Sequence, residues 1–317
     1  MHIPFSFHFH LLLLFSLISN NVFSQAIQKH EFQYQKMGTT FRIIFYHPSH
    51  QLPQNIEDQI NKKIDHLNSV FSDYDADSEI SQLSKTAGTD QKVKVSKELW
   101  QVLRQAQCYA RKSDGAFDIT IGPLSKLWRS MFRRSEIFDG VKINAAKSLV
   151  GYQNLQLFPF SKRVKLKVKG MRLDAGGIAK GYTVDAIAKI LLDSDIDQFL
   201  VDGGGDLYLG NPPPDKMGWT VKISVEDQND QSITQKLVLS NTAVASSGDT
   251  YRFLEWEGKR YSHIIDPRTG YGVIDRKIIN VQAPTCMQAD AIASTLSVLS
   301  VDEQAAFLKK FKKVKVF

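Results

Sequence analysis

The chain has 317 residues, of which 43% are hydrophobic and 23% charged, and its formal net charge is +7 at pH 7. These values are typical of soluble globular proteins, and a chain of this length buries a full core without disulfide or metal support. The basic residues are spread along the sequence, which argues against nucleic-acid binding, and the positive charge fits either attraction of an anionic ligand or ordinary surface solubility.

An apolar run, Leu11–Ile18, follows an N-terminal segment that contains no Lys or Arg. The run has the length of a signal-peptide core and is much shorter than the about 20 residues that a membrane-spanning helix needs. We therefore expect residues 1–24 to be a signal peptide, cut between Ser24 and Gln25. The mature protein is then exported, soluble and periplasmic rather than membrane-spanning. No cysteine lies near the predicted cut, so a lipid anchor of the bacterial lipoprotein kind is excluded.

Hydrophobic patterning predicts the elements of the N-terminal half. A pair of strands is expected within 31–46, around a turn at Met37–Thr40, because the flanking residues are largely β-branched and aromatic. Apolar residues at helical spacing predict a helix over 56–70, a short helix near Ile80 and a second long helix over 97–113.

The C-terminal half changes to a pattern of strand, glycine turn and helix. The predicted elements are strands over 165–168, 199–202, 219–225, 235–240 and 243–246, and helices over 179–192 and from about 288 to 299. Lysines alternate with apolar residues over 309–316, which predicts the solvated face of a terminal helix or strand. Strands interleaved with three or four helices, with no internal repeat, predict one α+β domain over residues 25–317.

The two cysteines fall in different parts of this pattern. Cys108 lies in the second long helix, and Cys286 lies in a loop before the last one. We expect both to be unpaired, although the sequence leaves a disulfide between them open. With no CxxC motif or His/Cys cluster, no zinc site is expected.

Two glycine-rich segments have the chemistry of anion-binding turns. In 174–182 (DAGGIAKGY), glycines directly precede a predicted helix, whose free N–H groups and positive dipole end attract phosphate. Asp174 and Lys180 add an acceptor and a cation. The three glycines of 202–206 (DGGGD) permit positive φ and a concave group of amides. The structural alternatives are a tight strand-to-helix turn and a bulged hairpin, and neither segment matches a P-loop or a dinucleotide-fold GxGxxG motif.

Three further segments offer groups for catalysis or binding. Asp290 and Ser294 share one helix face, and their oxygens suit Mg²⁺, although an N-cap Asp followed by a helical Ser gives the same pattern. His263 precedes the turn Asp266–Gly270 and is a candidate proton acceptor near neutral pH, although a lone histidine is more often structural. Segment 115–124 (GAFDITIGPL) fits either a wall for a planar ring or an ordinary turn into a strand.

Together and in this order, the motifs resemble the ApbE family, the FAD:protein FMN transferases, once described as thiamine-biosynthesis lipoproteins. The likeness extends from about Tyr34 to beyond Ser300, which is essentially the whole mature chain. The resemblance implies a T-fold-like α+β domain with mostly antiparallel sheets and FAD in a central cleft. The matching segments are Met37-Gly-Thr, 74–83 (YDADSEISQL), 115–124, 174–182, 202–206, 262–270 (SHIIDPRTG) and 289–294 (ADAIAS).

Enzymes of this family are exported, bind FAD and use Mg²⁺ on its pyrophosphate. They transfer FMN through a phosphoester bond to a Thr or Ser of a flavoprotein, typically a subunit of a membrane electron-transfer complex, and release AMP. The resemblance places Asp290, Ser294 and a main-chain carbonyl near Gly177 on the metal, and it leaves His263 and Asp290 as the catalytic pair, with His263 as the proposed base. By position, the FAD site would consist of Met37, Tyr74, Ala116, Phe117, Asp118, Asp174, Lys180, Ile265 and Ala293.

This chain departs from the family in two ways. Ser294 stands where members usually have Thr, which keeps the hydroxyl, and the lipoprotein cysteine of many members is absent. The shared motifs also leave other readings open. These are hydrolysis of FAD to FMN and AMP, a non-catalytic exported flavin-binding protein, and a role in thiamine biosynthesis that rests only on the old family label.

Overall fold

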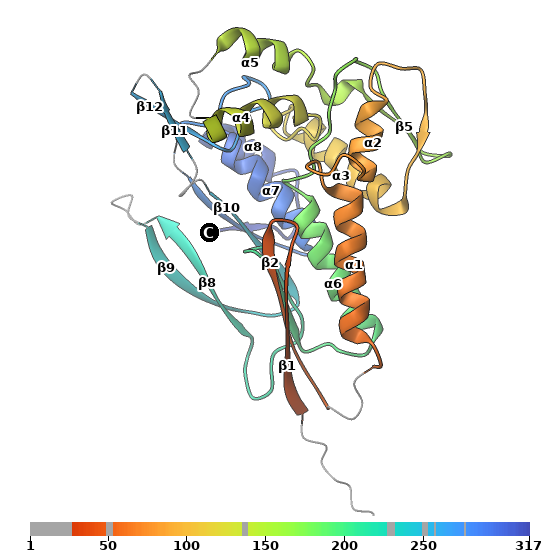
Figure 1. Ribbon diagram of the computed structural model, residues 1–317. Helices are drawn as coiled ribbons and strands as arrows, with labels where there is room; N and C mark the ends of the chain where they lie inside the picture. The colour runs from red at the N-terminus through yellow and green to blue at the C-terminus, as the bar shows by residue number, and fades with distance from the viewer. Residues whose placement is uncertain are drawn as a thin grey trace, which may run out of the picture.

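The computed structural model describes residues 27–48, 53–134, 139–226, 232–248, 253–256, 258–275 and 277–317 (Figure 1). The predicted signal peptide and its cleavage point lie outside the described residues. The α-helices are α1 Ile56–Phe71, α2 Glu79–Lys85, α3 Lys97–Lys112, α4 Gly122–Arg134, α5 Gly140–Lys147, α6 Ala179–Asp193, α7 Cys286–Val298 and α8 Val301–Leu308. Within the described residues, none of the helices is long and apolar enough to cross a membrane.

Antiparallel strands form four sheets. The largest has seven strands in the order β1-β2-β6-β7-β10-β13-β14, and β3-β5-β4, β8-β9 and β11-β12 form the others. The strands are β1 Ile27–Lys36, β2 Thr39–Pro48, β3 Val93–Lys94, β4 Leu155–Phe158, β5 Arg163–Leu166, β6 Phe199–Gly203, β7 Leu207–Leu209, β8 Trp219–Glu226, β9 Ser232–Leu239, β10 Thr242–Gly248, β11 Phe253–Trp256, β12 Lys259–Ser262, β13 Ile278–Ala283 and β14 Lys315–Val316. The predicted α+β class with mostly antiparallel sheets is confirmed.

The seven-stranded sheet is covered on both faces. Phe41, Ile43 and Phe45 alternate along β2 and are fully buried against α1 and α6, because successive side chains of a strand point to opposite faces. On the other face, Ile44 packs with Trp219 of the β8–β9 hairpin. Helices therefore cover one face of the sheet and a hairpin covers the other.

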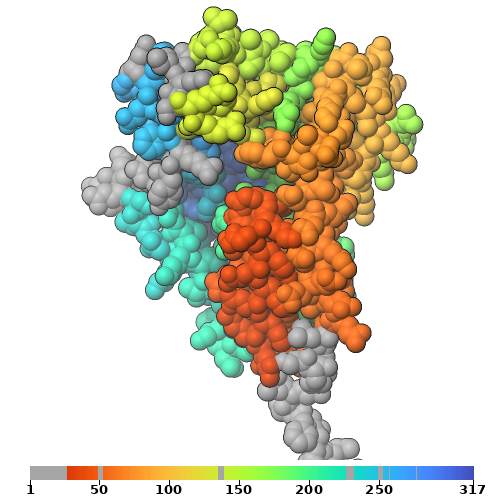
Figure 2. Space-filling model, in the orientation of Figure 1, coloured from red at the N-terminus to blue at the C-terminus, as the bar shows by residue number. Residues whose placement is uncertain are grey.

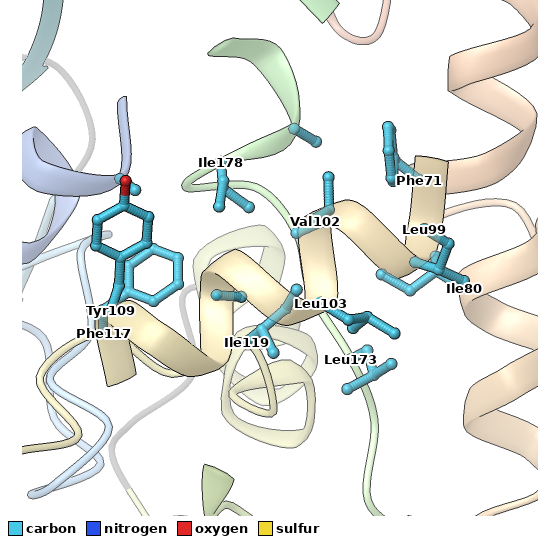
Figure 3. Packing of buried hydrophobic residues seen from close by; sticks show 14 of the residues in the cluster. Phe71, Ile80, Leu99, Val102, Leu103, Tyr109, Phe117, Ile119, Leu173 and Ile178 are labelled. Atoms are coloured by element: carbon cyan, nitrogen blue, oxygen red, sulfur yellow. The ribbon is translucent and has the colours of Figure 1, made fainter. Parts of the chain in front are cut away.

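A second core surrounds α3. Its apolar stripe includes Leu99 and Val102, which pack with Phe71 of α1 and Ile80 of α2 (Figure 3). The same cluster reaches Ile178, just before α6, so the core and the glycine turn of residues 174–178 belong to one packed unit.

The turn between β6 and β7 lies directly against the turn between β1 and β2. Gly204 has φ +75°, and a Cβ at this position would collide with the Thr39 side chain, so only glycine fits. Figure 2 shows the tip of the β1–β2 hairpin beside α1, below a hollow whose upper edge is the α4–α5 region. Blue C-terminal chain is visible at the floor of this hollow.

Some predictions about single elements were wrong. The described residues contain eight α-helices, so the predicted three or four were too few, and α4, α5 and α8 match no predicted helix. The segment 115–124 leads into α4 rather than into a strand, and Cys286 is the first residue of α7 rather than part of a loop. Both cysteines are free, as expected. Lysines 309, 310, 312, 313 and 315 are exposed, in agreement with a solvated face.

Candidate functional site

The helices α6 and α7 complete each other's first turns. The Gly181 N–H of α6 donates to Asp290 Oδ2 of α7 at 3.0 Å, and α6 has no side-chain N-cap of its own. In return, Asp185 of α6 accepts the N–H groups of Cys286 and Met287 at 2.7 and 2.9 Å. A Cβ at Gly181 would lie 2.5 Å from the Cys286 carbonyl oxygen, so glycine permits this close approach. Each helix thus supplies a carboxylate for the otherwise free N–H groups of the other.

Lys180 joins two buried carboxylates at this crossing. Its ammonium donates to the Asp206 carboxylate and lies 3.9 Å from Asp290 Oδ2. Burial raises the pKa of both carboxyl groups. Burial alone would lower the pKa of Lys180, but the attraction of Asp290 and Asp206 outweighs it and raises that pKa. When both acids are ionised, the single ammonium leaves one negative charge, which a bound cation would neutralise.

Asp185 was not expected from the sequence, and its contacts predict a clear stability effect. Burial raises the pKa of Asp185 to about 6, so near neutral pH the side chain is ionised and accepts both N–H groups of α7. Asp185→Ala should lower the free energy of unfolding by about 2–3 kcal/mol, because two N–H groups lose a charged acceptor. Asp185→Asn keeps one acceptor oxygen and should lose less.

Urea denaturation followed by circular dichroism measures this effect. The matched control is Asp193→Ala, which removes an exposed acid paired with Lys189 at the end of the same helix and should change stability little. An unchanged unfolding midpoint in Asp185→Ala would mean that the first turn of α7 finds other acceptors.

Gly177 and Ser294 lie against each other beside this crossing. A Cβ at Gly177 would be 3.0 Å from Ser294 Oγ and 3.3 Å from the Phe117 ring, so the main chain of the glycine turn approaches the hydroxyl directly. Asp290 is one helical turn before Ser294 on α7. Asp290 and Ser294 therefore lie on one face of α7, and carboxylate and hydroxyl oxygens are ligands that Mg²⁺ accepts. A magnesium site made by these two residues and a main-chain carbonyl near Gly177 stays a prediction. Among the described residues no group of three His, Cys, Asp or Glu side chains offers an alternative metal site.

Asp174 is held from two sides at the start of the glycine turn. Its Oδ1 accepts the Gly176 N–H at 2.8 Å, and its Oδ2 accepts from Arg129 of α4 at 2.6 Å. Arg129 also binds Asp73 and lies 4.2 Å from the centre of the Tyr74 ring. The structure therefore brings Tyr74 and Asp174 together through an arginine that the sequence analysis did not single out.

Residues 116–118 lie next to the glycine turn, because the Phe117 ring packs against Gly177. Ala116 and Phe117 are buried in the α3 core. The Asp118 carboxylate accepts from the Thr120 N–H and hydroxyl at 2.8 and 2.7 Å and from the Tyr152 N–H at 2.8 Å. Those contacts fix the turn and join it to the segment at Tyr152, and contact of residues 116–118 with FAD stays a prediction.

The remaining predicted residues lie in different surroundings. Met37 has φ +53° in the β1–β2 turn, and its sulfur accepts the Thr183 hydroxyl of α6 at 3.5 Å. Ala293 is buried on α7, and Ile265 is buried in a cluster with α4 and α5. His263 lies at an exposed bend after β12. The role of His263 as general base stays a prediction.

The fold and these contacts define an α+β protein in which a glycine turn, two helix starts and a buried Lys–Asp cluster meet, a geometry suited to a phosphate-bearing ligand. The sequence model of the ApbE family matches residues 37–317. The chain therefore belongs to the ApbE family, as the motifs predicted.

Known relatives extend over most of the chain. An FAD:protein FMN transferase of Treponema pallidum is 32% identical, with 74% of this chain and 68% of the relative covered. A flavin transferase ApbE structure from Vibrio cholerae superposes with a TM-score of 0.83 at 26% identity and covers 92% of this chain and 93% of the other. A mutant of the Vibrio cholerae protein, with a histidine replaced by glycine, matches with a TM-score of 0.81 at 26% identity, with 91% and 92% covered.

Proposed function

We propose that this chain is an FAD:protein FMN transferase, which uses Mg²⁺ to move FMN from FAD to a Thr or Ser hydroxyl of an acceptor flavoprotein and releases AMP. The main support is the position of Asp290 and Ser294 on one face of α7, with Ser294 against Gly177 and Asp290 beside the ion pair of Lys180 and Asp206. Relatives that bear this activity in their names align over most of the chain.

The donor set fits Mg²⁺. The Asp290 carboxylate, the Ser294 hydroxyl and the Gly177 carbonyl would hold the ion, which typically takes only a few protein ligands and completes its shell with water and substrate phosphate. When bound, it supplies positive charge to the FAD diphosphate and to the departing AMP. A bound cation would favour the ionised forms of Asp290 and Asp206, whose pKa values burial raises.

FAD would occupy the hollow between the β1–β2 turn and α4. We assign its contacts to Met37, Tyr74, the main chain of 116–118, Asp174, Lys180, Ile265 and Ala293. Lys180, at the start of α6, supplies positive charge for the phosphate oxygens, while the Gly181 N–H of the same turn is bonded to Asp290. Asp174 is held by Arg129 and the Gly176 N–H, so this part of the site is rigid before the ligand arrives.

The transfer itself needs a proton acceptor. The acceptor hydroxyl oxygen forms a bond to the phosphorus of the FMN half, the bond from that phosphorus to the bridging oxygen breaks, and AMP leaves. We assign the hydroxyl proton to the His263 imidazole. The exposure of His263 at the bend after β12 suits a group that must meet another protein.

The predicted signal peptide indicates where the protein acts. We propose that residues 1–24 direct export and that the enzyme acts in the periplasm on flavoprotein subunits of membrane electron-transfer complexes. N-terminal sequencing of the exported protein should begin at Gln25, and a retained leader would contradict this proposal.

One experiment separates transfer from hydrolysis and from simple flavin binding. The purified chain is incubated with FAD, Mg²⁺ and a Thr-containing acceptor domain, and flavin fluorescence is read in a denaturing gel. A fluorescent acceptor band that disappears with EDTA supports transfer. Free FMN without a labelled acceptor identifies a hydrolase, and unchanged FAD identifies a binding protein.

A further inference from the structure

Arg129 connects three segments that are distant in sequence. It lies on α4, and its two terminal nitrogens bind Asp73 Oδ2 at 2.5 Å and Asp174 Oδ2 at 2.6 Å. Asp73 belongs to the connection between α1 and α2, and Asp174 begins the glycine turn before α6. One planar guanidinium therefore fixes the relative position of all three segments.

The two carboxylates need this cation. The Asp73 side chain is 8% exposed and that of Asp174 is 9% exposed. Burial and the neighbouring Asp174 raise the pKa of Asp73, whereas Arg129 and Arg172 lower it. A lysine ammonium is a compact point charge, whereas the planar guanidinium presents separate N–H donors in a fixed fork, one to each carboxylate.

The same guanidinium lies over an exposed aromatic ring. Its central carbon is 4.2 Å from the Tyr74 ring centre, yet the tyrosine is 79% exposed. An exposed tyrosine in a connection would otherwise exchange between rotamers, and the stacked cation favours one orientation. The ring borders a cavity of about 520 Å³ that Lys126 and Arg172 also line, and Tyr74 is the one residue of the assigned FAD contacts in that lining.

We propose that Arg129 is a positioning residue for FAD, which holds the Tyr74 ring as a stacking platform for one of the two planar ring systems of FAD. This inference rests on the proposed function and adds a residue to its site. Arg129 also fixes Asp174, whose other oxygen shapes the turn that contains Gly177. It acts through these neighbours and takes no part in the bond changes, so it determines how tightly FAD binds rather than how fast bound FAD reacts.

The test compares Arg129→Met with Arg133→Met, which removes an exposed arginine at the end of the same helix. Arg129→Met should raise the KM for FAD about tenfold or more and leave kcat within a factor of two or three, because a cation–π platform and its rigid support are lost. Arg129→Lys should recover only part of the affinity, because an ammonium keeps the charge but lacks the planar guanidinium that stacks on the Tyr74 ring. A fall in kcat at unchanged KM would overturn the proposal.

Binding of the two halves of FAD gives a second readout. If Arg129 were purely structural, its loss would not change the affinity for one half selectively. ADP and FMN are titrated separately by calorimetry against wild type, Arg129→Met and Tyr74→Ala. Loss of affinity for one fragment only, the same in both variants, supports a platform for that ring system. Equal losses for both fragments, or none, overturn it. Tyr74 is exposed, so Tyr74→Ala remains informative even if Arg129→Met does not fold.

Wild-type transfer is measured in parallel. If the wild type fails to label an acceptor but the fragment titrations behave as expected, the proposed function fails while the role of Arg129 in nucleotide binding stands.

Discussion

Asp290→Ala is expected to abolish Mg²⁺-dependent FMN transfer, the largest effect predicted for any single change in this chain. The substitution removes the only carboxylate of the proposed metal set, and Ser294 and the Gly177 carbonyl are neutral ligands that hold Mg²⁺ poorly alone. Transfer is measured as acceptor labelling against Mg²⁺ concentration. Full activity in the variant would remove Asp290 from the metal site.

Asp290→Ala also removes a contact that stabilises the fold, and this effect must be separated from loss of the metal ligand. Asp290 also accepts the Gly181 N–H, so alanine leaves the first turn of α6 without its acceptor and lowers stability as well. Asp290→Asn keeps an oxygen for that N–H but loses the charge. We expect Asp290→Asn to melt within a few degrees of the wild type and still to be inactive. Asp302→Ala, at an exposed acid of α8, is the control for a surface carboxylate.

His263→Ala is expected to lower the transfer rate by about 10²–10⁴-fold while FAD binding persists, because this is the usual contribution of a positioned general base. Rates are measured at saturating FAD and acceptor, and FAD binding is followed separately by flavin fluorescence. His66→Ala removes another exposed histidine, which pairs with Glu98 away from the glycine turn, and should transfer at the wild-type rate. A wild-type rate in His263→Ala would assign the proton to a different group.

The sequence predicted the long amphipathic helices and half of the described strands, and it missed short ones such as β3, β4 and β7. The helices over 56–70 and 97–113 were found because their buried residues recur at helical spacing. The helix α5 was missed because Ile143 is its only buried residue, so no apolar stripe marks it. The helix α4 was missed because the glycine and Asp before it are equally typical of a turn into a strand.

The site was predictable only in part. The spacing of Asp290 and Ser294 on one helix face was visible in the sequence, but their approach to Gly177 came from the family resemblance. Arg129 was not found, because its partners lie 45 and 56 residues away and no local pattern marks such a bridge. The contacts of Asp118 were also hidden, since only the structure shows that its carboxylate accepts from Thr120 and from the distant Tyr152.

The reciprocal contacts of α6 and α7 also determine how this part of the protein unfolds. The amides of Gly181, Cys286 and Met287 are protected by acceptors from the opposite helix, so they exchange with solvent only when the pair separates. The three amides should therefore exchange with one common opening free energy. Because Asp290 belongs to the same unit, destabilising changes elsewhere should reduce the fraction of molecules with an intact site and leave the affinity of each intact site unchanged.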